Sequence, residues 1–482
     1  MISLSWYKIT GILIYTNLPK YSLNLQTSLN IKSMKFLKIT AKILLGLVIL
    51  ILILLAFTIA PVDRTDYREM AYSKQMNEQL EAWKPSKDTA NNFKAGWATV
   101  NLTPSKPTPT AGYGDRKGKP YQSIHDSVYV RAIVLSNSSK PVAIVSCDLL
   151  IFPPEVTILL KEKLKTIGFD WSQVYAGTTH THNSLGAWGK NTVGELFAGK
   201  YDQNTVNHIA NKVLEAIKKA AQNQVSAKIG YGEISAKELV FNRLVGDKLG
   251  TTDPMIRLLK IQKQTGEVAI FTTFSAHATT LNADKNFLSA DYPGEYVQRL
   301  SKTVNFATFM AGAVGSSGPT GEELHDDFQQ EKTISEGLSI KVLKEINNIK
   351  TQEISTLSLS SFEVVLREPQ VRFAENWRFR PWVFKTLFGD YKAEIKTFRI
   401  GNNVLIGTPC DYSGELMPEV LQVARSKNLN LIVTSFNGGY VGYITHDRHY
   451  DLNSYETRTM NWYGPQNGVY FQDIIQKILN KI

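Results

Sequence analysis

One stretch of the chain reads Val174-Tyr175-Ala176-Gly177-Thr178-Thr179-His180-Thr181-His182-Asn183. Its apolar first half predicts the end of a buried strand, and two histidines follow at alternate positions. Side chains two residues apart on a strand share a face, so we expect His180 and His182 to enter one cleft. Paired imidazoles are suitable zinc ligands, although two hydrogen-bonded histidines at a strand end would give the same pattern.

Apolar runs alternate with amphipathic segments along the rest of the chain. The run at 142–150 precedes a helical pattern at 155–167, and the same succession recurs at 271–278 and 292–300 and at 306–314 and 334–346. This alternation predicts an α/β fold, a large single domain of stacked β-sheets flanked by helices, over residues 93–482. Glycine and proline clusters at 315–319 and 437–442 follow strands and mark loops where a site would lie.

The N-terminal part of the chain contains a candidate membrane anchor. Residues 43–62 form an almost unbroken apolar run, about as long as the roughly 20 residues that cross a bilayer. Three lysines between residues 35 and 42 precede it, so the positive-inside rule places segment 1–42 in the cytoplasm and the large domain on the extracytoplasmic side. The run is long for a cleaved signal peptide, which favours an uncleaved, single-pass signal-anchor. Residues 63–92 are polar and helix-prone, and we expect them to form a helical linker.

Composition indicates a globular protein and excludes some function classes. The chain has 482 residues, of which 43% are hydrophobic and 20% are charged. Its net charge of +11 comes from scattered lysines, not from a dense basic tract with interleaved aromatics, so a nucleic-acid partner is not expected. Cys147 and Cys410 are the two cysteines; two buried free thiols are favoured over one bridge.

Three further side chains lie where loops follow apolar runs. His277 ends the run 271–278, Asp411 follows a short predicted strand at 403–406, and Tyr443 lies in a glycine-rich loop. Each alone has a structural explanation: a core histidine, a turn aspartate and a packed aromatic. Together with the two histidines they form a candidate ligand set.

These segments together resemble the neutral/alkaline non-lysosomal ceramidase family, whose marks include Thr-His-Thr-His-Ser and Tyr-Ile-Thr-Thr. The corresponding residues here are Thr179-His180-Thr181-His182-Asn183 and Tyr443-Ile444-Thr445-His446. The resemblance runs in the same order from about residue 96 to 465. It also takes in the segments 124–126, 145–149, 242–243, 455–456 and 463–465.

The resemblance implies a zinc ion held by two histidines, a carboxylate and a tyrosine. Matching residue by residue places these roles on His180, His277, Asp411 and Tyr443. The implied activity is that of a membrane-anchored amidohydrolase, which cleaves an amide bond of an N-acyl lipid with a metal-activated water.

The resemblance also implies residues around the reaction centre. It places His182, Arg243 and Tyr455 there, for proton transfer and for stabilising an oxyanion. Asp148 is either an orienting partner of a ligand histidine or a strand-end cap.

Two departures from the family pattern bear on the activity. Asp411 replaces a glutamate and reaches about 1.5 Å less, which leaves Glu415 as a fallback ligand. The loop 315–320 places Gly318 at the position of the family's active-site serine, so Ser317 or Ser316 would have to substitute. A related metal hydrolase of a non-ceramide amide or ester, or a catalytically silent lipid-binding member, therefore stays an alternative.

One segment combines aromatic and basic residues. Residues 373–391 contain Trp377, Trp382, Phe384 and Phe388 together with Arg378, Arg380 and Lys385. Such a mixture suits a lipid headgroup interface, although an insertion packed on the domain has a similar composition.

Overall fold

The computed structural model describes residues 23–85, 92–137, 140–321 and 326–482, with side chains from residue 33 onward. It divides into two compact units, Met1–Ile59 and Ala60–Ile482. Part of the predicted cytoplasmic segment 1–42 and part of the predicted linker 63–92 lie outside the described residues.

The first unit contains one long helix, α1 (Leu23–Thr58). Its part Ser33–Thr58 is apolar, and it is long enough to cross a membrane by length and composition. The apolar run in the sequence extends to Val62, but the helix ends at Thr58, and Ile59–Pro61 forms the short strand β1.

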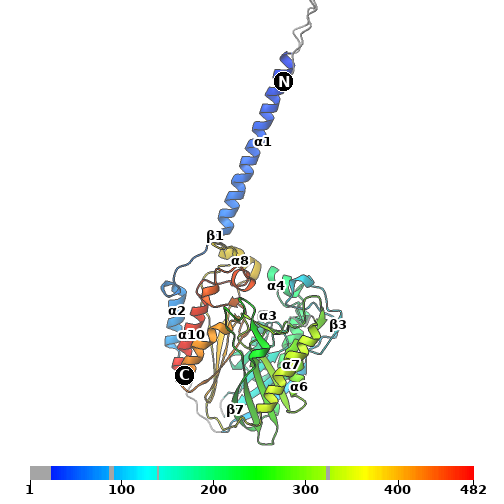
Figure 1. The fold of residues 1–482 in the computed structure, drawn as a ribbon, viewed down its shortest axis with the longest axis vertical. Helices are drawn as coiled ribbons and strands as arrows, with labels where there is room; N and C mark the ends of the chain where they lie inside the picture. The colour runs from blue at the N-terminus through cyan, green and yellow to red at the C-terminus, as the bar shows by residue number, and fades with distance from the viewer. Residues whose placement is uncertain (1–22, 86–91, 138–139, 322–325) are drawn as a thin grey trace, which may run out of the picture. The chain divides into compact units, whose positions relative to one another are not determined.

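The second unit is built on two large sheets (Figure 1). An eight-stranded sheet has the order β12-β10-β9-β7-β2-β4-β5-β6, and a four-stranded sheet has the order β14-β17-β18-β20. The strands of the first are β2 (Lys94–Asn101), β4 (Tyr129–Ser136), β5 (Val142–Cys147), β6 (Val174–Thr178), β7 (Val225–Ser235), β9 (Met255–Lys263), β10 (Val268–Phe274) and β12 (Phe306–Ala311). Those of the second are β14 (Leu357–Glu363), β17 (Glu394–Ile400), β18 (Asn403–Gly407) and β20 (Asn430–Thr434).

Helices cover the outer faces of these sheets. One apolar cluster lies between the two sheets, and three others pack helices against their outer faces. The helices are α2 (Ala71–Ala82), α3 (Pro154–Lys163), α4 (Thr192–Ala198), α5 (Gln203–Gln222), α6 (Asp291–Leu300), α7 (Asp327–Glu345), α8 (Pro381–Phe388), α9 (Met417–Ser426) and α10 (Asn467–Lys481). The α/β architecture predicted from the sequence is confirmed.

Burial explains why these segments adopt their structure. All residues of β5 are buried, which accounts for a continuous apolar run instead of an alternating one. Helix α5 buries Val206, Ile209, Val213 and Ile217, whose spacing of three or four residues defines one helix face. Cys147 and Cys410 are buried free thiols, as the sequence favoured.

The eight-stranded sheet contains two parallel pairs of strands, and the four-stranded sheet contains one. These pairs are β5 with β6, β10 with β12, and β18 with β20. The two strands of a parallel pair end at the same edge of their sheet, so the loops that follow them lie close together. His180 follows β6, His277 follows β10, and Asp411 follows β18.

Small sheets then join these loops to one another. The strands β19 (Asp411–Tyr412) and β21 (Tyr443–Ile444) are parallel, and Asp411 pairs directly with Tyr443. The strands β8 (Val240–Asn242) and β13 (Ser317–Pro319) are antiparallel. Two more short strands, β3 (Ser123–Ile124) and β11 (Phe287–Leu288), form a parallel pair. Residues far apart in the sequence are thereby fixed side by side by backbone hydrogen bonds.

The segment predicted as a linker contains a packed helix. Met76 and Leu80 of α2 are fully buried, in an apolar cluster that also contains Phe471 and Ile475 of α10. The two helices lie side by side (Figure 1). Residues 71–82 therefore contribute to the core of the second unit.

Replacing Leu80 with alanine should lower the free energy of unfolding by about 2–5 kcal/mol, because it removes buried methyl groups and leaves a cavity. Gln75→Ala, an exposed position on the same helix, should change stability by less than about 0.5 kcal/mol. Denaturant unfolding of the full chain measures both values. Equal, small effects would show that α2 contributes nothing to folding.

Candidate metal centre

His180 reaches its position through a turn and not through a strand. Strand β6 ends at Thr178, and His180 has a φ of +64°, in the left-handed region. The prediction that His180 and His182 share a face because they alternate along a strand is therefore wrong in its reason, because strand β6 ends before both histidines. The His180 amide donates to the carbonyl of Leu149 at 3.0 Å, and its Nδ1 lies 2.7 Å from the carbonyl oxygen of Leu150. Its ring stacks on Phe436, with centroids 3.9 Å apart.

His277 is held in the same manner. Its ring is fully buried, and its Nδ1 lies 3.0 Å from the carbonyl oxygen of Val314 and 3.1 Å from that of Ser317. A carbonyl oxygen only accepts, so Nδ1 carries the proton and donates in both histidines. Their Nε2 atoms therefore carry the lone pairs and face the inside of the cluster, where Arg243 Nη2 also lies 3.3 Å from His277 Nε2.

Five predicted site residues converge around these Nε2 atoms. Asp411 Oδ1 lies 3.2 Å from His277 Nε2 and 3.5 Å from His180 Nε2. The Tyr443 hydroxyl lies 3.0 Å from His277 Nε2. His182 Nε2 lies 3.3 Å from His180 Nε2. The structure thus brings together the four predicted metal ligands and one predicted catalytic histidine.

The donor set fits a cation. Asp411 is fully buried, and its Oδ1 has no hydrogen-bond partner among the described residues. Imidazole nitrogens and a carboxylate oxygen that face one another across about 3 Å in a buried site are an arrangement expected of metal ligands. His180, His182 and His277 can hold a metal ion by the proximity of their ring nitrogens.

Burial sets the charge state of these groups. It lowers the pKa of His180 to about 3 and lowers the pKa values of His182 and His277 well below their usual range. The imidazoles are therefore neutral at physiological pH, as ligands must be. Burial also raises the pKa of Asp411, so a carboxylate here requires a compensating positive charge.

Tyr440 positions the carboxylate of Asp411, and sequence reasoning missed it. Its hydroxyl donates to Asp411 Oδ2 at 2.6 Å. This bond occupies one carboxylate oxygen and leaves Oδ1 facing the histidines. Its place in the predicted loop 437–442, three residues before Tyr443, was the available signal.

The backbone at His182 is fixed by a buried arginine that the sequence did not single out. Arg116 donates from Nη1 to the carbonyl of His182 at 2.8 Å and from Nη2 to Asn183 Oδ1 at 3.2 Å. His182 Nδ1 is buried without a hydrogen-bond partner among the described residues. Gly112 packs against this ring, and a Cβ there would lie 2.7 Å from Nδ1, so this close approach requires glycine.

Arg243 and Tyr455, which the family resemblance places near the reaction centre, border the cluster. Arg243 donates from Nη2 to the Tyr443 hydroxyl at 3.0 Å, and its Nε lies 3.0 Å from a carboxylate oxygen of Glu456. Tyr455 packs edge-on against Tyr443, with ring centroids 5.8 Å apart, and is half-exposed. The guanidinium is thus held between a phenol of the cluster and a carboxylate.

The altered serine loop contacts the cluster through its backbone. The Ser317 carbonyl accepts from His277, whereas its hydroxyl is buried without a partner among the described residues. The Ser316 hydroxyl is bonded to that of Ser413 at 2.7 Å. A Cβ at Gly318 would lie 3.6 Å from Arg243 Cδ. A side chain at residue 318 would therefore reach the same group that borders the metal centre.

Two other residues weighed from the sequence have different partners. The carboxylate of Asp148 forms a buried ion pair with Arg131 at 2.8 Å, so the carbonyl of Leu150 orients His180 instead. Glu415 is bonded to Arg448 and to His449. Neither carboxylate is directed at the candidate metal centre.

An apolar cavity opens beside the cluster. It is bounded by His180, His182 and Tyr443 at one end and reaches residues of α4 and α8. Its wall is largely aromatic and aliphatic, and includes Leu150, Trp188, Phe197, Phe388 and Trp462. Such a cavity suits an apolar chain attached to a polar reacting group.

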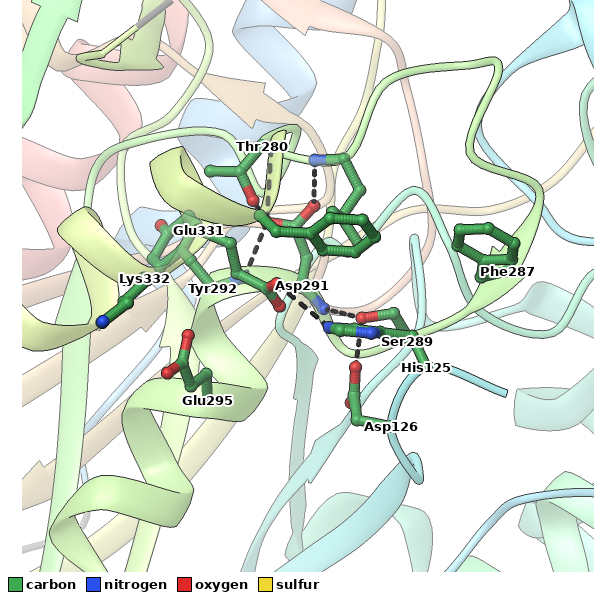
Figure 2. A network of polar contacts seen from close by, with 12 residues as sticks. His125, Asp126, Thr280, Phe287, Ser289, Asp291, Tyr292, Glu295, Glu331 and Lys332 are labelled. Atoms are coloured by element: carbon green, nitrogen blue, oxygen red, sulfur yellow. Dashed lines mark hydrogen bonds and ion pairs between the residues drawn. The ribbon is translucent and has the colours of Figure 1, made fainter. Parts of the chain in front are cut away.

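A second polar network lies at the loop between β10 and α6 (Figure 2). His125 Nε2 lies 3.2 Å from Glu331 Oε2. The neighbouring Asp126 accepts from the Ser289 hydroxyl and from the amide of Ala290. His125, Asp126 and Glu331 are close enough to hold a metal. Their polar atoms already have partners, however: His125 pairs with Glu331, and Asp126 accepts from Ser289 and Ala290.

This network braces the segment that carries His182. The Ser289 carbonyl accepts from the Thr181 hydroxyl at 2.9 Å. The Ser289 amide donates to the carbonyl of Asn183 at 2.9 Å. The residues on both sides of His182 are therefore fixed to a loop that Asp126 holds in place.

Comparison with known proteins places this geometry in a family. Residues 93–312 match the family model described as neutral/alkaline non-lysosomal ceramidase, N-terminal. This range contains His180, His182, Arg243 and His277 and ends before Asp411. No curated protein matches the chain significantly.

Solved structures extend the similarity to most of the chain. A neutral ceramidase from Pseudomonas aeruginosa aligns over 81% of this chain and 74% of its own, with a TM-score of 0.70 and 17% identity. A ceramidase complexed with C2 aligns over 80% and 74%, with the same TM-score and identity. At this identity the likeness concerns the fold. The family resemblance inferred from the sequence motifs is confirmed over residues 93–312, which match the neutral/alkaline non-lysosomal ceramidase family, whose members are hydrolases.

Proposed function

We propose that the protein is a membrane-anchored, zinc-dependent hydrolase that cleaves an amide bond of an N-acyl lipid. The observation that carries this proposal is the convergence of His180, His277, Asp411 and Tyr443, within 3.5 Å of their neighbours, beside an apolar cavity. The family match supports hydrolysis as the reaction class.

Zinc is the metal we propose, held by His180, His277, Asp411 and Tyr443. Neutral imidazoles and carboxylate oxygen are ligands that Zn²⁺ accepts, and two rings already bonded through Nδ1 have their Nε2 atoms oriented in advance. When bound, zinc would acidify a water molecule and polarise the substrate carbonyl.

The remaining predicted residues have roles that follow from their contacts. Burial lowers the pKa of His182 and keeps its ring neutral at rest. As the proton carrier of this proposal, it would take up a proton only once negative charge develops beside it, and it would pass that proton to the leaving amine. The Arg243 guanidinium can donate hydrogen bonds to the oxyanion of a tetrahedral intermediate, and the Tyr455 hydroxyl can do the same from the cavity side. Ser317 contributes its carbonyl to the orientation of His277.

A lipid-like amide is the substrate class we propose. The aromatic cavity supports an acyl chain, and its end at the histidines would place the amide at the metal centre. The loop with Gly318 instead of a serine supports a second candidate, hydrolysis of a non-ceramide amide or ester.

We also propose that α1 anchors the protein as a signal-anchor. Ser33–Thr58 has the length and composition of a membrane-spanning helix. Lysines at its N-terminal side support a cytoplasmic N-terminus and an extracytoplasmic catalytic domain.

Purified full-length protein should contain about one zinc per chain, since such a site holds a single ion. His277→Ala should lose the metal and reduce amide hydrolysis by roughly 10³-fold, because the site loses both a ligand and the charge stabilisation that depends on the ion. Elemental analysis and turnover measure the two effects. His208 lies on α5, and its ring is bonded to the carbonyl of Leu102. His208→Ala should leave the zinc content and the turnover unchanged.

Activity that persists in the metal-free His277→Ala protein would contradict the zinc mechanism. If His277→Ala loses a bound metal but the parent protein hydrolyses no amide, the result would instead favour a catalytically silent lipid-binding member.

Turnover should be faster on long-chain N-acyl sphingoid lipids than on simple, short-chain N-acyl amino acids, because the apolar cavity gains binding energy from burying a long acyl chain and little from a short one. Product release from both substrates, measured with the same enzyme preparation, compares the two. Hydrolysis of the short amide alone would reject the lipid substrate and favour the second candidate.

Tyr440→Phe should weaken metal binding about 10- to 100-fold, because the Asp411 carboxylate loses the hydrogen bond that orients it. Competition with a chelator measures the affinity. Tyr470→Phe removes a buried tyrosine hydroxyl bonded to the carbonyl of Val365 and should leave metal affinity unchanged. Equal affinities in the two variants would show that Tyr440 does not position the ligand.

A further inference from the structure

The far end of the apolar cavity is bordered by two helices with exposed apolar side chains. Residues of α4 and α8 line the cavity, and these helices contact each other. On their outer sides, Leu196 is 58% exposed and Trp382 is 54% exposed, and Leu387 is also exposed. Helices at the surface of a soluble protein usually present polar residues to water. Exposed apolar side chains at these positions therefore indicate a surface that binds another apolar surface.

The hairpin that precedes α8 continues this apolar character. Phe373 of β15 (Arg372–Ala374) and Trp377 of β16 (Trp377–Phe379) are both about half-exposed. We refer to Leu196, Phe373, Trp377, Trp382 and Leu387 as the rim residues.

Basic side chains accompany the rim residues. The segment 372–390 contains four arginines or lysines and two acidic residues. Arg380 and Lys385 are exposed. Exposed tryptophan next to arginine and lysine is the composition of proteins at a membrane–water interface, where the ring enters the headgroup layer and the cation meets anionic lipid.

The chain itself ties this hairpin to the candidate membrane helix. The Pro61 carbonyl accepts from Arg378 Nε at 3.1 Å, and the Val62 amide donates to the carbonyl of Asn376 at 3.0 Å. Strand β1 joins β16 and β15 in one sheet. Thr58, the last residue of α1, is three residues before Pro61, so it lies no more than about 11 Å from it along an extended chain.

We propose that the rim residues dock on the outer surface of the bilayer that holds α1, so that a lipid enters the cavity between α4 and α8 directly from the membrane. This inference rests on the anchor in the proposed function. The short connection limits how far the hairpin can lie from the point where α1 leaves the membrane, so the hairpin can reach the membrane surface. The apolar cavity then continues from the lipid phase to the metal centre, and the substrate does not have to cross water.

The test uses the full chain in nanodiscs of anionic and zwitterionic phospholipid. Single cysteines are introduced as Trp382→Cys, Leu387→Cys and, as the control, Ile340→Cys, an exposed apolar position on α7 that lies apart from α8 (Figure 1). Each is labelled with an environment-sensitive fluorophore. The native Cys147 and Cys410 are fully buried and are not expected to react under native conditions.

Labels at residues 382 and 387 should be quenched roughly twofold by lipids with a spin label in the acyl chain, because docked side chains enter about 5–10 Å into the interface. The label at residue 340 should not be quenched. Quenching should be stronger with anionic lipid.

Two results overturn the proposal in distinguishable ways. If the protein incorporates into nanodiscs but all three labels behave alike, docking is rejected and the anchor stands. If the protein does not associate with lipid at all, both docking and the anchor are rejected. Neither result depends on zinc or on amide hydrolysis, so the catalytic proposal is tested separately.

Discussion

The geometry of the candidate site depends on the hydrogen bonds that two buried imidazoles make with main-chain carbonyls. His180 and His277 each place Nδ1 against a carbonyl oxygen that no side-chain substitution can remove. The proton is therefore fixed on the outer side of each ring, and the inner nitrogens face Asp411 as acceptors. A group of acceptors enclosed in an apolar interior is unfavourable by itself. A bound cation would relieve that cost.

The arrangement of strands explains how residues more than two hundred positions apart reach this point. Two parallel strand pairs of the eight-stranded sheet and one of the four-stranded sheet are each followed by a loop that contributes one ligand. The pairing of Asp411 with Tyr443 fixes two of these loops to each other. The ligands thus lie on short segments that rigid strands hold at both sides, which limits the rearrangement that binding requires.

Much of this could be predicted from the sequence, and the exceptions have physical reasons. The strand and helix at 142–167 were predictable because complete burial gives an uninterrupted apolar run. The turn at His180 was not, because the left-handed conformation is set by the bonds to neighbouring carbonyls. Tyr440 and Arg116 were missed because their roles depend on contacts between distant loops. The burial of Leu80 was missed because α2 has few apolar residues, and these pack only once α10 is in place.

The network around His125 has a consequence for how protons affect folding. Burial raises the pKa of Glu331 to about 7 and that of Asp126 to about 6, and the bond to Glu331 raises the pKa of His125. In all three cases the folded chain holds its proton at a pH where the unfolded chain has released it. Between about pH 4 and 7 the folded state therefore binds more protons than the unfolded state, and this network's contribution to stability falls as pH rises. The loop beside His182 is thus attached to a network whose contribution to stability is largest in mild acid and is reduced once the pH rises above about 7.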